Sequence, residues 1–156
     1  MHVLESDHAV SGPPIRMAAS AFEMMARAAR AAFPRECCGA LLGPAPAPGA
    51  PRRVEAVVPA ANEAADGPRY RLGPEAVRAL DAEARRRGLC VVGYYHSHPR
   101  GGARPSALDR ELAWPWLVYV IQPVHAHGAG EPAAWTLEHG RGAFARCPLS
   151  IDNLED

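Results

Sequence analysis

A chain of 156 residues, 48% of them hydrophobic, is long enough for one compact domain with a buried core, which excludes a wholly disordered protein. The 17 basic and 17 acidic residues cancel, so no net field attracts nucleic acid or an anionic membrane, and we expect neither as a partner. No apolar run reaches the roughly 18 residues of a membrane-spanning helix. Residues 1–14 lack the apolar segment of a secretory signal, so the cytoplasm is the expected location.

The first half of the chain predicts a domain that follows a flexible tail at residues 1–12. Ser20–Phe33 carries apolar side chains at helical spacing and stops before Pro34, which predicts a helix. Cys38–Gly43 is short and apolar, as in a buried strand, and the proline-rich segment 44–51 after it predicts a loop. Further strands are expected over Arg53–Val58 and Arg69–Leu72.

The second half begins with a predicted helix over Pro74–Arg87, because proline suits a first helical turn and Gly88 can end the helix. Leu89–Tyr95 has the strongest strand pattern in the chain and runs directly into a histidine pair. A short helix is expected over Ser106–Ala113. The remaining predicted strands are Trp116–Ile121, Pro132–Leu137 and Gly142–Arg146.

This irregular alternation predicts an α/β (α+β) fold, a mixed β-sheet flanked by helices, over residues 13–147, with an acidic C-terminal tail at residues 148–156. The four cysteines form no CxxC pair and are all expected to be reduced, which argues against a cysteine-rich zinc module. They are Cys37, Cys38, Cys90 and Cys147. All 17 basic residues are arginine, and a GC-rich genome accounts for this together with the abundant Ala, Gly and Pro. The oligomeric state is left open, with a homodimer among the options.

The first candidate site is His96-x-His98. Alternate side chains of a strand point to the same side, so both imidazoles project together, as two metal ligands must. The pair follows a buried strand and precedes Pro99, which turns the chain away and leaves the rings at the sheet edge. A second HxH, at His125 and His127, lacks these features and is interpreted as loop surface.

Ser106-x-x-Asp109 has two interpretations. Ser106 as helix N-cap and Asp109 three residues later form an ordinary capping pair. The preceding loop is also long enough to return the helix over the histidine pair, where Asp109 could be a third ligand. Two His and one carboxylate with an open fourth position form a catalytic zinc set.

Such a site needs a base to accept a proton from water, and Glu36 is the candidate. It lies where the first helix passes into an apolar strand. The alternative, a surface carboxylate in a loop, is not rejected by the spacing alone.

Taken together, Glu36, His96-Ser97-His98, Ser106 and Asp109 resemble the complete signature of the JAMM (MPN+) zinc metalloprotease family. Glu36-Cys37-Cys38-Gly39 is similar to the start of its bacterial and archaeal branch, and the similarity extends to Asn62, Arg69-Tyr70-Arg71 and the Gly93-Tyr94-Tyr95 approach to the histidines. The resemblance covers about Ile15 to Leu137 and implies the MPN fold, which is similar to that of cytidine deaminases.

The resemblance also assigns roles. It implies Zn²⁺ held by His96, His98 and Asp109, with Glu36 as general base and the Ser106 hydroxyl stabilising the oxyanion. The implied reaction is hydrolysis of a peptide or isopeptide bond after the C-terminal glycine of a ubiquitin-like or sulfur-carrier protein. Small stand-alone bacterial members resemble enzymes that release cysteine from such a carrier, and this version is favoured. The alternatives are a deubiquitinase-like enzyme of a bacterial conjugation system and a non-catalytic MPN binding scaffold.

Overall fold

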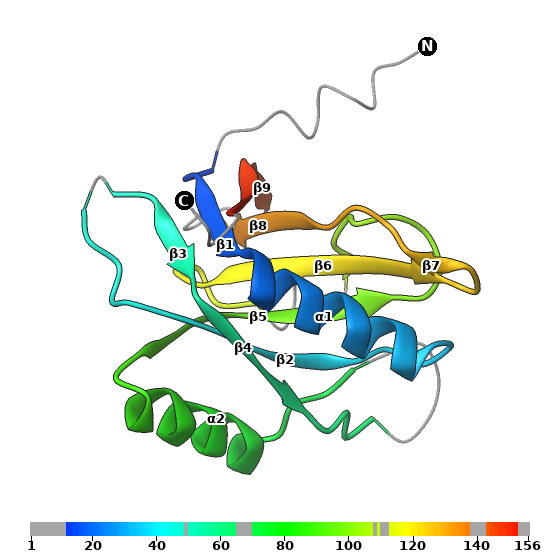
Figure 1. The fold of residues 1–156 in the computed structure, drawn as a ribbon, viewed down its shortest axis with the longest axis horizontal. Coiled ribbons are helices and arrows are strands. Elements are labelled where there is room, and N and C mark those ends of the chain that lie inside the picture. The colour runs from blue at the N-terminus through cyan, green and yellow to red at the C-terminus, as the bar shows by residue number, and fades with distance from the viewer. Residues whose placement is uncertain are drawn as a thin grey trace.

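The computed structural model describes residues 12–48, 50–64, 70–107, 109, 113–137 and 143–152. Within these ranges, a seven-stranded mixed sheet has the order β4-β2-β5-β6-β8-β9, with β7 paired to β6 (Figure 1). Its strands are β2 (Cys38–Gly43), β4 (Ala56–Ala60), β5 (Cys90–His98), β6 (Val118–His125), β7 (Gly128–Ala129), β8 (Ala133–Leu137) and β9 (Phe144–Cys147). The central pair, β5 and β6, runs parallel, and the other pairings of this sheet are antiparallel.

Two helices pack on opposite faces of this sheet, and the alternation of β2 shows why. Leu41 packs with α1 (Ala19–Ala32), whereas Ala40 and Leu42 pack with α2 (Pro74–Arg86). All six residues of β2 are buried, because both faces of the strand are covered. The expected fold class, a mixed sheet flanked by helices, is confirmed.

A smaller sheet joins the two ends of the described chain. It consists of β1 (Ile15–Ala18), which pairs in parallel with both β3 (Arg52–Val54) and β10 (Leu149–Asp152). The sequence pattern predicts neither β1 nor β10, and it places residues 149–152 in the acidic tail. Residues 1–11 and 153–156, the rest of the two predicted tails, lie outside the described residues.

Several predicted boundaries change. The strand expected over Arg53–Val58 is divided between β3 and β4, which belong to different sheets. Residues 70–72, the described part of a predicted strand, are not a strand, and the Arg71 N–H donates to the Asn62 side chain. β5 extends past Tyr95 through both histidines. Ala107 and Asp109 are helical, and Leu108 and residues 110–112 lie outside the described residues. No helix in the described ranges has the length and apolarity to span a membrane.

Candidate metal centre and active site

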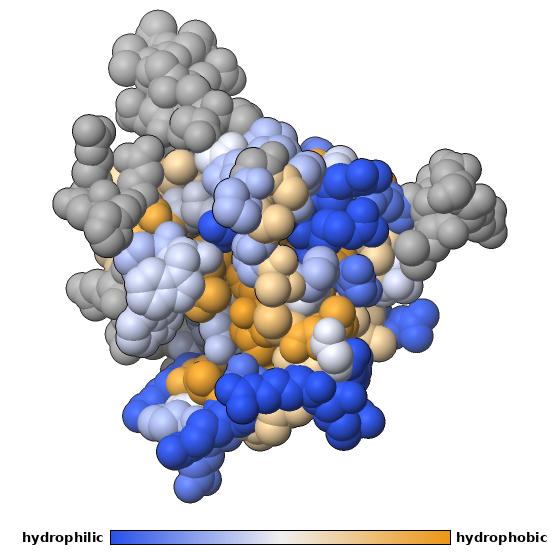
Figure 2. All heavy atoms as spheres, turned by 90° about the vertical axis from the view of Figure 1, so that its left-hand side faces the viewer, coloured by the Kyte–Doolittle hydropathy of each residue, from blue (hydrophilic) through white to orange (hydrophobic). Residues whose placement is uncertain are grey.

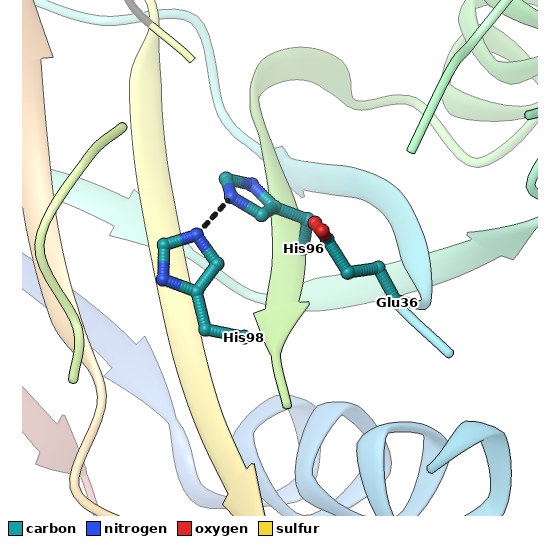
Figure 3. Close-up of side chains that lie close together, drawn as sticks. All are labelled: Glu36, His96 and His98. Atoms are coloured by element: carbon teal, nitrogen blue, oxygen red, sulfur yellow. Dashed lines mark hydrogen bonds between the residues drawn. The ribbon is translucent and has the colours of Figure 1, made fainter. Parts of the chain in front are cut away.

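The histidine pair lies at the end of β5, between β2 and β6. His96 is opposite Cys38 of β2 and Ile121 of β6, so it lies inside the sheet, and only 1% of its surface is exposed. The alternation of the strand points His96 and His98 to the same side, as predicted. Their Nε2 atoms approach to 3.0 Å (Figure 3).

Asp109 completes the cluster. Its Oδ1 lies 3.2 Å from Nε2 of His96, and its Oδ2 lies 3.3 Å from Nε2 of His98. Asp109 also forms the predicted capping pair, because its N–H donates to Ser106 Oγ at 3.1 Å and its Oδ2 accepts from Ser106 N–H at 2.7 Å. The two interpretations of Ser106-x-x-Asp109 are therefore compatible: the cap holds the carboxylate that faces the histidines.

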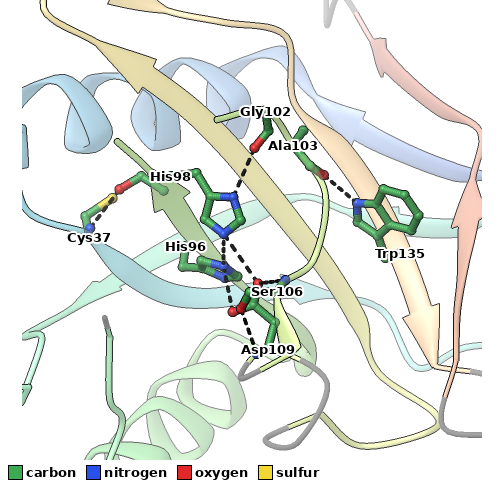
Figure 4. A network of polar contacts seen from close by, with 9 residues as sticks. Cys37, His96, His98, Gly102, Ala103, Ser106, Asp109 and Trp135 are labelled. Atoms are coloured by element: carbon green, nitrogen blue, oxygen red, sulfur yellow. Dashed lines mark hydrogen bonds and ion pairs between the residues drawn. The ribbon is translucent and has the colours of Figure 1, made fainter. Parts of the chain in front are cut away.

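The loop between the histidines and Ser106 is anchored at two carbonyls (Figure 4). The indole of Trp135 on β8 donates to the Ala103 carbonyl at 2.8 Å, and His98 Nδ1 lies 3.0 Å from the Gly102 carbonyl. A carbonyl can only accept, so Nδ1 of His98 carries a proton and donates it to the Gly102 carbonyl. The sequence pattern predicts neither anchor.

Glu36 lies beside this cluster in the segment between α1 and β2. It is 8% exposed, so the interpretation as a solvated loop carboxylate does not hold. One carboxylate oxygen and one ring nitrogen each of His96 and His98 lie within 4.8 Å of one another. These three side chains form a cluster that can hold a metal ion (Figure 3).

Burial and charge set the protonation of the four groups. Burial raises the pKa of Glu36 to about 7, with smaller opposing contributions from His98 and Asp109. Burial lowers the pKa of His96, so this ring is neutral at physiological pH. Burial also lowers the pKa of His98, but contacts with Asp109 and Gly102 outweigh it and raise that pKa. For Asp109, burial raises the pKa, yet hydrogen bonds from both histidines hold it far below its usual range. The cluster thus combines an ionised carboxylate, Asp109, with a carboxyl group, Glu36, that can exchange a proton near neutral pH.

The donor set fits a zinc ion. Ligand atoms bound at about 2.0–2.1 Å in a tetrahedron lie roughly 3.3–3.4 Å from one another. The Nε2 atoms of His96 and His98 and the oxygens of Asp109 are separated by 3.0, 3.2 and 3.3 Å, close to that spacing. The hydrogen bond of His98 Nδ1 to a backbone carbonyl is the arrangement that metal-ligating histidines ordinarily show.

Three further side chains touch the centre, and the sequence pattern gives them no role. The Tyr70 ring stacks on His96, with ring centroids 4.5 Å apart and planes 19° from parallel. Ser97, buried between the two histidines, accepts a hydrogen bond from Cys37 N–H at 2.8 Å. Asn62 donates to the Glu36 carbonyl at 2.9 Å. Tyr70 and Asn62 are part of the family resemblance, which was the one available signal for them.

Cys38 lies next to the cluster, opposite His96 in the sheet, whereas the second HxH pair lies at the far end of β6. Cys38 is buried, its thiol points toward the Ala60 carbonyl, and burial raises its pKa to about 12, as for a packed thiol. His125, the last residue of β6, and His127, in the turn that follows, are both exposed, and only His127 lies in the loop expected for the pair. The four cysteines are unpaired.

A largely apolar groove of about 950 Å³ lies beside the centre. Tyr70 belongs to both, because its ring lines the groove and stacks on His96. Trp114 and Trp116, 57% and 62% exposed, also line it, together with Arg71 and Arg78. The side of the molecule in Figure 2 likewise exposes apolar surface between groups of hydrophilic side chains. An apolar groove with two exposed tryptophans beside a polar centre is typical of a binding surface.

Comparison with known proteins shows which proteins this chain resembles. Residues 18–138 match the family described as prokaryotic homologs of the JAB domain. The chain is 44% identical to the desampylase of Haloferax volcanii over 91 residues, which cover 56% of this chain and 62% of that relative. The match therefore spans less than two thirds of the relative's length.

Solved structures agree. A protein from Desulfitobacterium hafniense has a TM-score of 0.77 and 28% identity, covering 89% of this chain and 93% of its own. A protein from Salinibacter ruber has a TM-score of 0.66 and 37% identity, covering 87% and 90%. A JAB1/MPN domain protein from Archaeoglobus fulgidus, at 16% identity and a TM-score of 0.53, shares the fold over 91% of this chain and the whole of its own. The chain belongs to the family of prokaryotic homologs of the JAB domain.

Proposed function

We propose that this protein is a zinc-dependent hydrolase that cleaves a peptide or isopeptide bond after the C-terminal glycine of a ubiquitin-like or sulfur-carrier protein. The observation that carries the proposal is the convergence of His96, His98 and Asp109, at 3.0–3.3 Å, beside the buried carboxyl of Glu36. The relative named desampylase supports a cleaving enzyme within this family. The unpaired cysteines are compatible with the cytoplasmic location expected from the sequence.

Each residue of the centre has a part in this proposal. Zinc, held by His96, His98 and Asp109, would polarise the scissile carbonyl and acidify water. Glu36, with a pKa near neutrality, accepts a proton from the attacking water and returns it to the leaving amine. Ser106 Oγ accepts from Asp109 N–H, so its own proton is available to the carbonyl oxygen that gains charge.

The groove supports a substrate with an extended tail. A C-terminal glycine has no side chain, so it can pass the Tyr70 ring that stacks on His96 and approach the centre closely. Residues before that glycine would lie along the apolar groove toward Trp114 and Trp116. The arginines of the groove favour an acidic carrier surface.

The test uses zinc-loaded protein and two substrates: a sulfur carrier bearing cysteine on its C-terminal glycine, and a ubiquitin-like protein joined to a lysine side chain. Intact-mass spectrometry before and after incubation should show loss of the amine fragment from one of them. A chelator and the Glu36→Gln variant should each abolish that loss. Tight binding of both substrates without cleavage would instead identify a scaffold, and retained cleavage in the chelated protein would refute the zinc-dependent mechanism.

A further inference from the structure

The peptide group that joins Glu36 to Cys37 is held at both of its polar atoms by side chains. Its carbonyl accepts from Asn62 Nδ2 at 2.9 Å, and its N–H donates to Ser97 Oγ at 2.8 Å. Glu36 and Cys37 lie after the end of α1 and before the start of β2. Neither element's regular hydrogen bonding therefore fixes this peptide plane, and the two side chains do so instead.

Asn62 also organises the segment that covers His96. Its Oδ1 accepts from the Ala64 N–H at 2.9 Å and from the Arg71 N–H at 3.1 Å. The residue before Arg71 is Tyr70, whose ring stacks on His96. One amide side chain thus links the backbone of Glu36 to the backbone next to Tyr70, on two sides of the same centre.

The orientation of a peptide plane restricts the side chain next to it. With the Glu36–Cys37 plane held, the position of the Glu36 Cα is held too, and only the rotation about its Cα–C bond and a few side-chain torsions remain before the carboxylate. A displacement of about 1 Å in a reacting group can lower a rate by about 10²-fold. Loss of the hydrogen bonds that hold this plane is therefore expected to lower the reaction rate.

We propose that Asn62 is a positioning residue, which holds the Glu36–Cys37 peptide group and thereby keeps the Glu36 carboxylate beside the His96–His98 pair. This inference rests on the proposed hydrolytic function only for its kinetic readout. Asn62 acts through the Glu36–Cys37 peptide group, which its amide donates to.

Two substitutions separate the contacts of Asn62. Asn62→Asp replaces the amide donor to Glu36 by a second oxygen and keeps an acceptor for the N–H groups of Ala64 and Arg71. Asn62→Ala removes every side-chain contact without adding charge. Arg35→Ala is the matched control, because the Arg35 guanidinium bonds the Ala64 carbonyl at 3.1 Å and so joins the same two segments without touching the held peptide group.

Kinetics of zinc-loaded proteins give the first readout. Asn62→Asp should lower kcat about 10–100-fold, with KM and zinc content within about twofold of wild type, because the groove and ligands are unchanged. Asn62→Ala should lower kcat similarly and also raise KM, through the lost support of the Tyr70 segment. Arg35→Ala should behave as wild type. Wild-type kcat in both Asn62 variants would overturn the proposal.

Crystal structures of the zinc-loaded wild type and both variants give the second readout. The proposal expects the Glu36–Cys37 peptide to rotate and the carboxylate to leave its place beside His98 in both variants. An unmoved carboxylate in both would overturn it. If the wild type cleaves no substrate, the proposed function fails, while this structural comparison still decides whether Asn62 positions Glu36.

Discussion

Glu36 combines burial with proximity to the histidines and a carboxyl that titrates near neutrality. A carboxylate in this place can serve either as a fourth ligand or as a base. Contacts of 3.0–3.3 Å join His96, His98 and Asp109 into a set of two imidazoles and one carboxylate, which is already a complete catalytic zinc set with an open fourth position. This donor set favours the base.

The base assignment makes a prediction about metal and rate together. Glu36→Gln should keep its zinc and its melting temperature, while its cleavage rate falls by about 10²–10⁴-fold, the usual contribution of a positioned base. The His96→Ala, His98→Ala double variant should lose zinc as well as activity. Elemental analysis and turnover of the same preparations provide the check. Loss of zinc from Glu36→Gln would make Glu36 a ligand.

The raised pKa of Glu36 also predicts how stability depends on pH. The folded value of about 7 exceeds the ordinary 4.5, so between these values the native state holds more protons than the unfolded state. Stability contributed by this group is therefore lost as pH rises through about 7. Glutamine has no carboxyl proton to lose. The free energy of unfolding of metal-free Glu36→Gln, relative to metal-free wild type, should therefore increase from about pH 5 to about pH 8.

Urea unfolding at about pH 5 and about pH 8, with a chelator present, measures the difference in unfolding free energy between Glu36→Gln and wild type. Glu23→Gln, at an exposed position on α1, is the control for replacing a surface carboxylate by an amide. An offset for Glu36→Gln that does not change with pH would contradict the buried, proton-holding carboxyl.

At the scale of elements, the close approach of β5 and β6 holds β5, the strand that carries His96 and His98, in place. Gly93 lies opposite Val118, and a Cβ at position 93 would lie 1.8 Å from the Val118 carbonyl oxygen. An alanine there must push the central strands apart three residues before His96. We expect Gly93→Ala to destabilise the fold by about 1–3 kcal/mol or more.

Thermal unfolding measures that loss, and Gly102→Ala is the matched control. A Cβ at Gly102 meets no atom within 4 Å, and the substitution keeps the carbonyl that faces His98. Gly102→Ala should therefore unfold as the wild type does. Equal melting temperatures for Gly93→Ala and Gly102→Ala would show that β5 and β6 accommodate a Cβ at position 93 without loss of stability.

The elements also show what a sequence can predict. Helical spacing and strong apolar runs locate α1, α2, β2 and β5, because burial on one or two faces dictates residue type. The short strands β1 and β10 are held by backbone pairing across the length of the chain, which leaves little pattern in residues 15–18 or 149–152. The HxH geometry follows from strand alternation alone. The Asn62 and Ser97 contacts with the Glu36–Cys37 peptide depend on loop paths, which local patterns do not encode.

At the scale of the whole molecule, the sequence has 17 arginines and no lysine, so it offers no lysine side chain as an acceptor amine. Arg85, in the last turn of α2, has a side chain that is 79% exposed and pairs with Asp81 at 3.0 Å. Arg85→Lys keeps the charge and the helix propensity, so the fold should be unchanged. The variant therefore introduces an accessible acceptor without another change.

Two explanations of the missing lysines differ in what this variant does. If lysine is avoided because a conjugating system would modify it, Arg85→Lys should acquire conjugates when co-expressed with a ubiquitin-like protein and its activating enzyme. The signal would be clearest in a Glu36→Gln background, which cannot remove them. We expect unmodified protein, because the abundance of Ala, Gly and Pro already points to genome composition. An intact-mass spectrum with an added modifier on Arg85→Lys, absent from the Glu36→Gln parent, would instead establish avoidance.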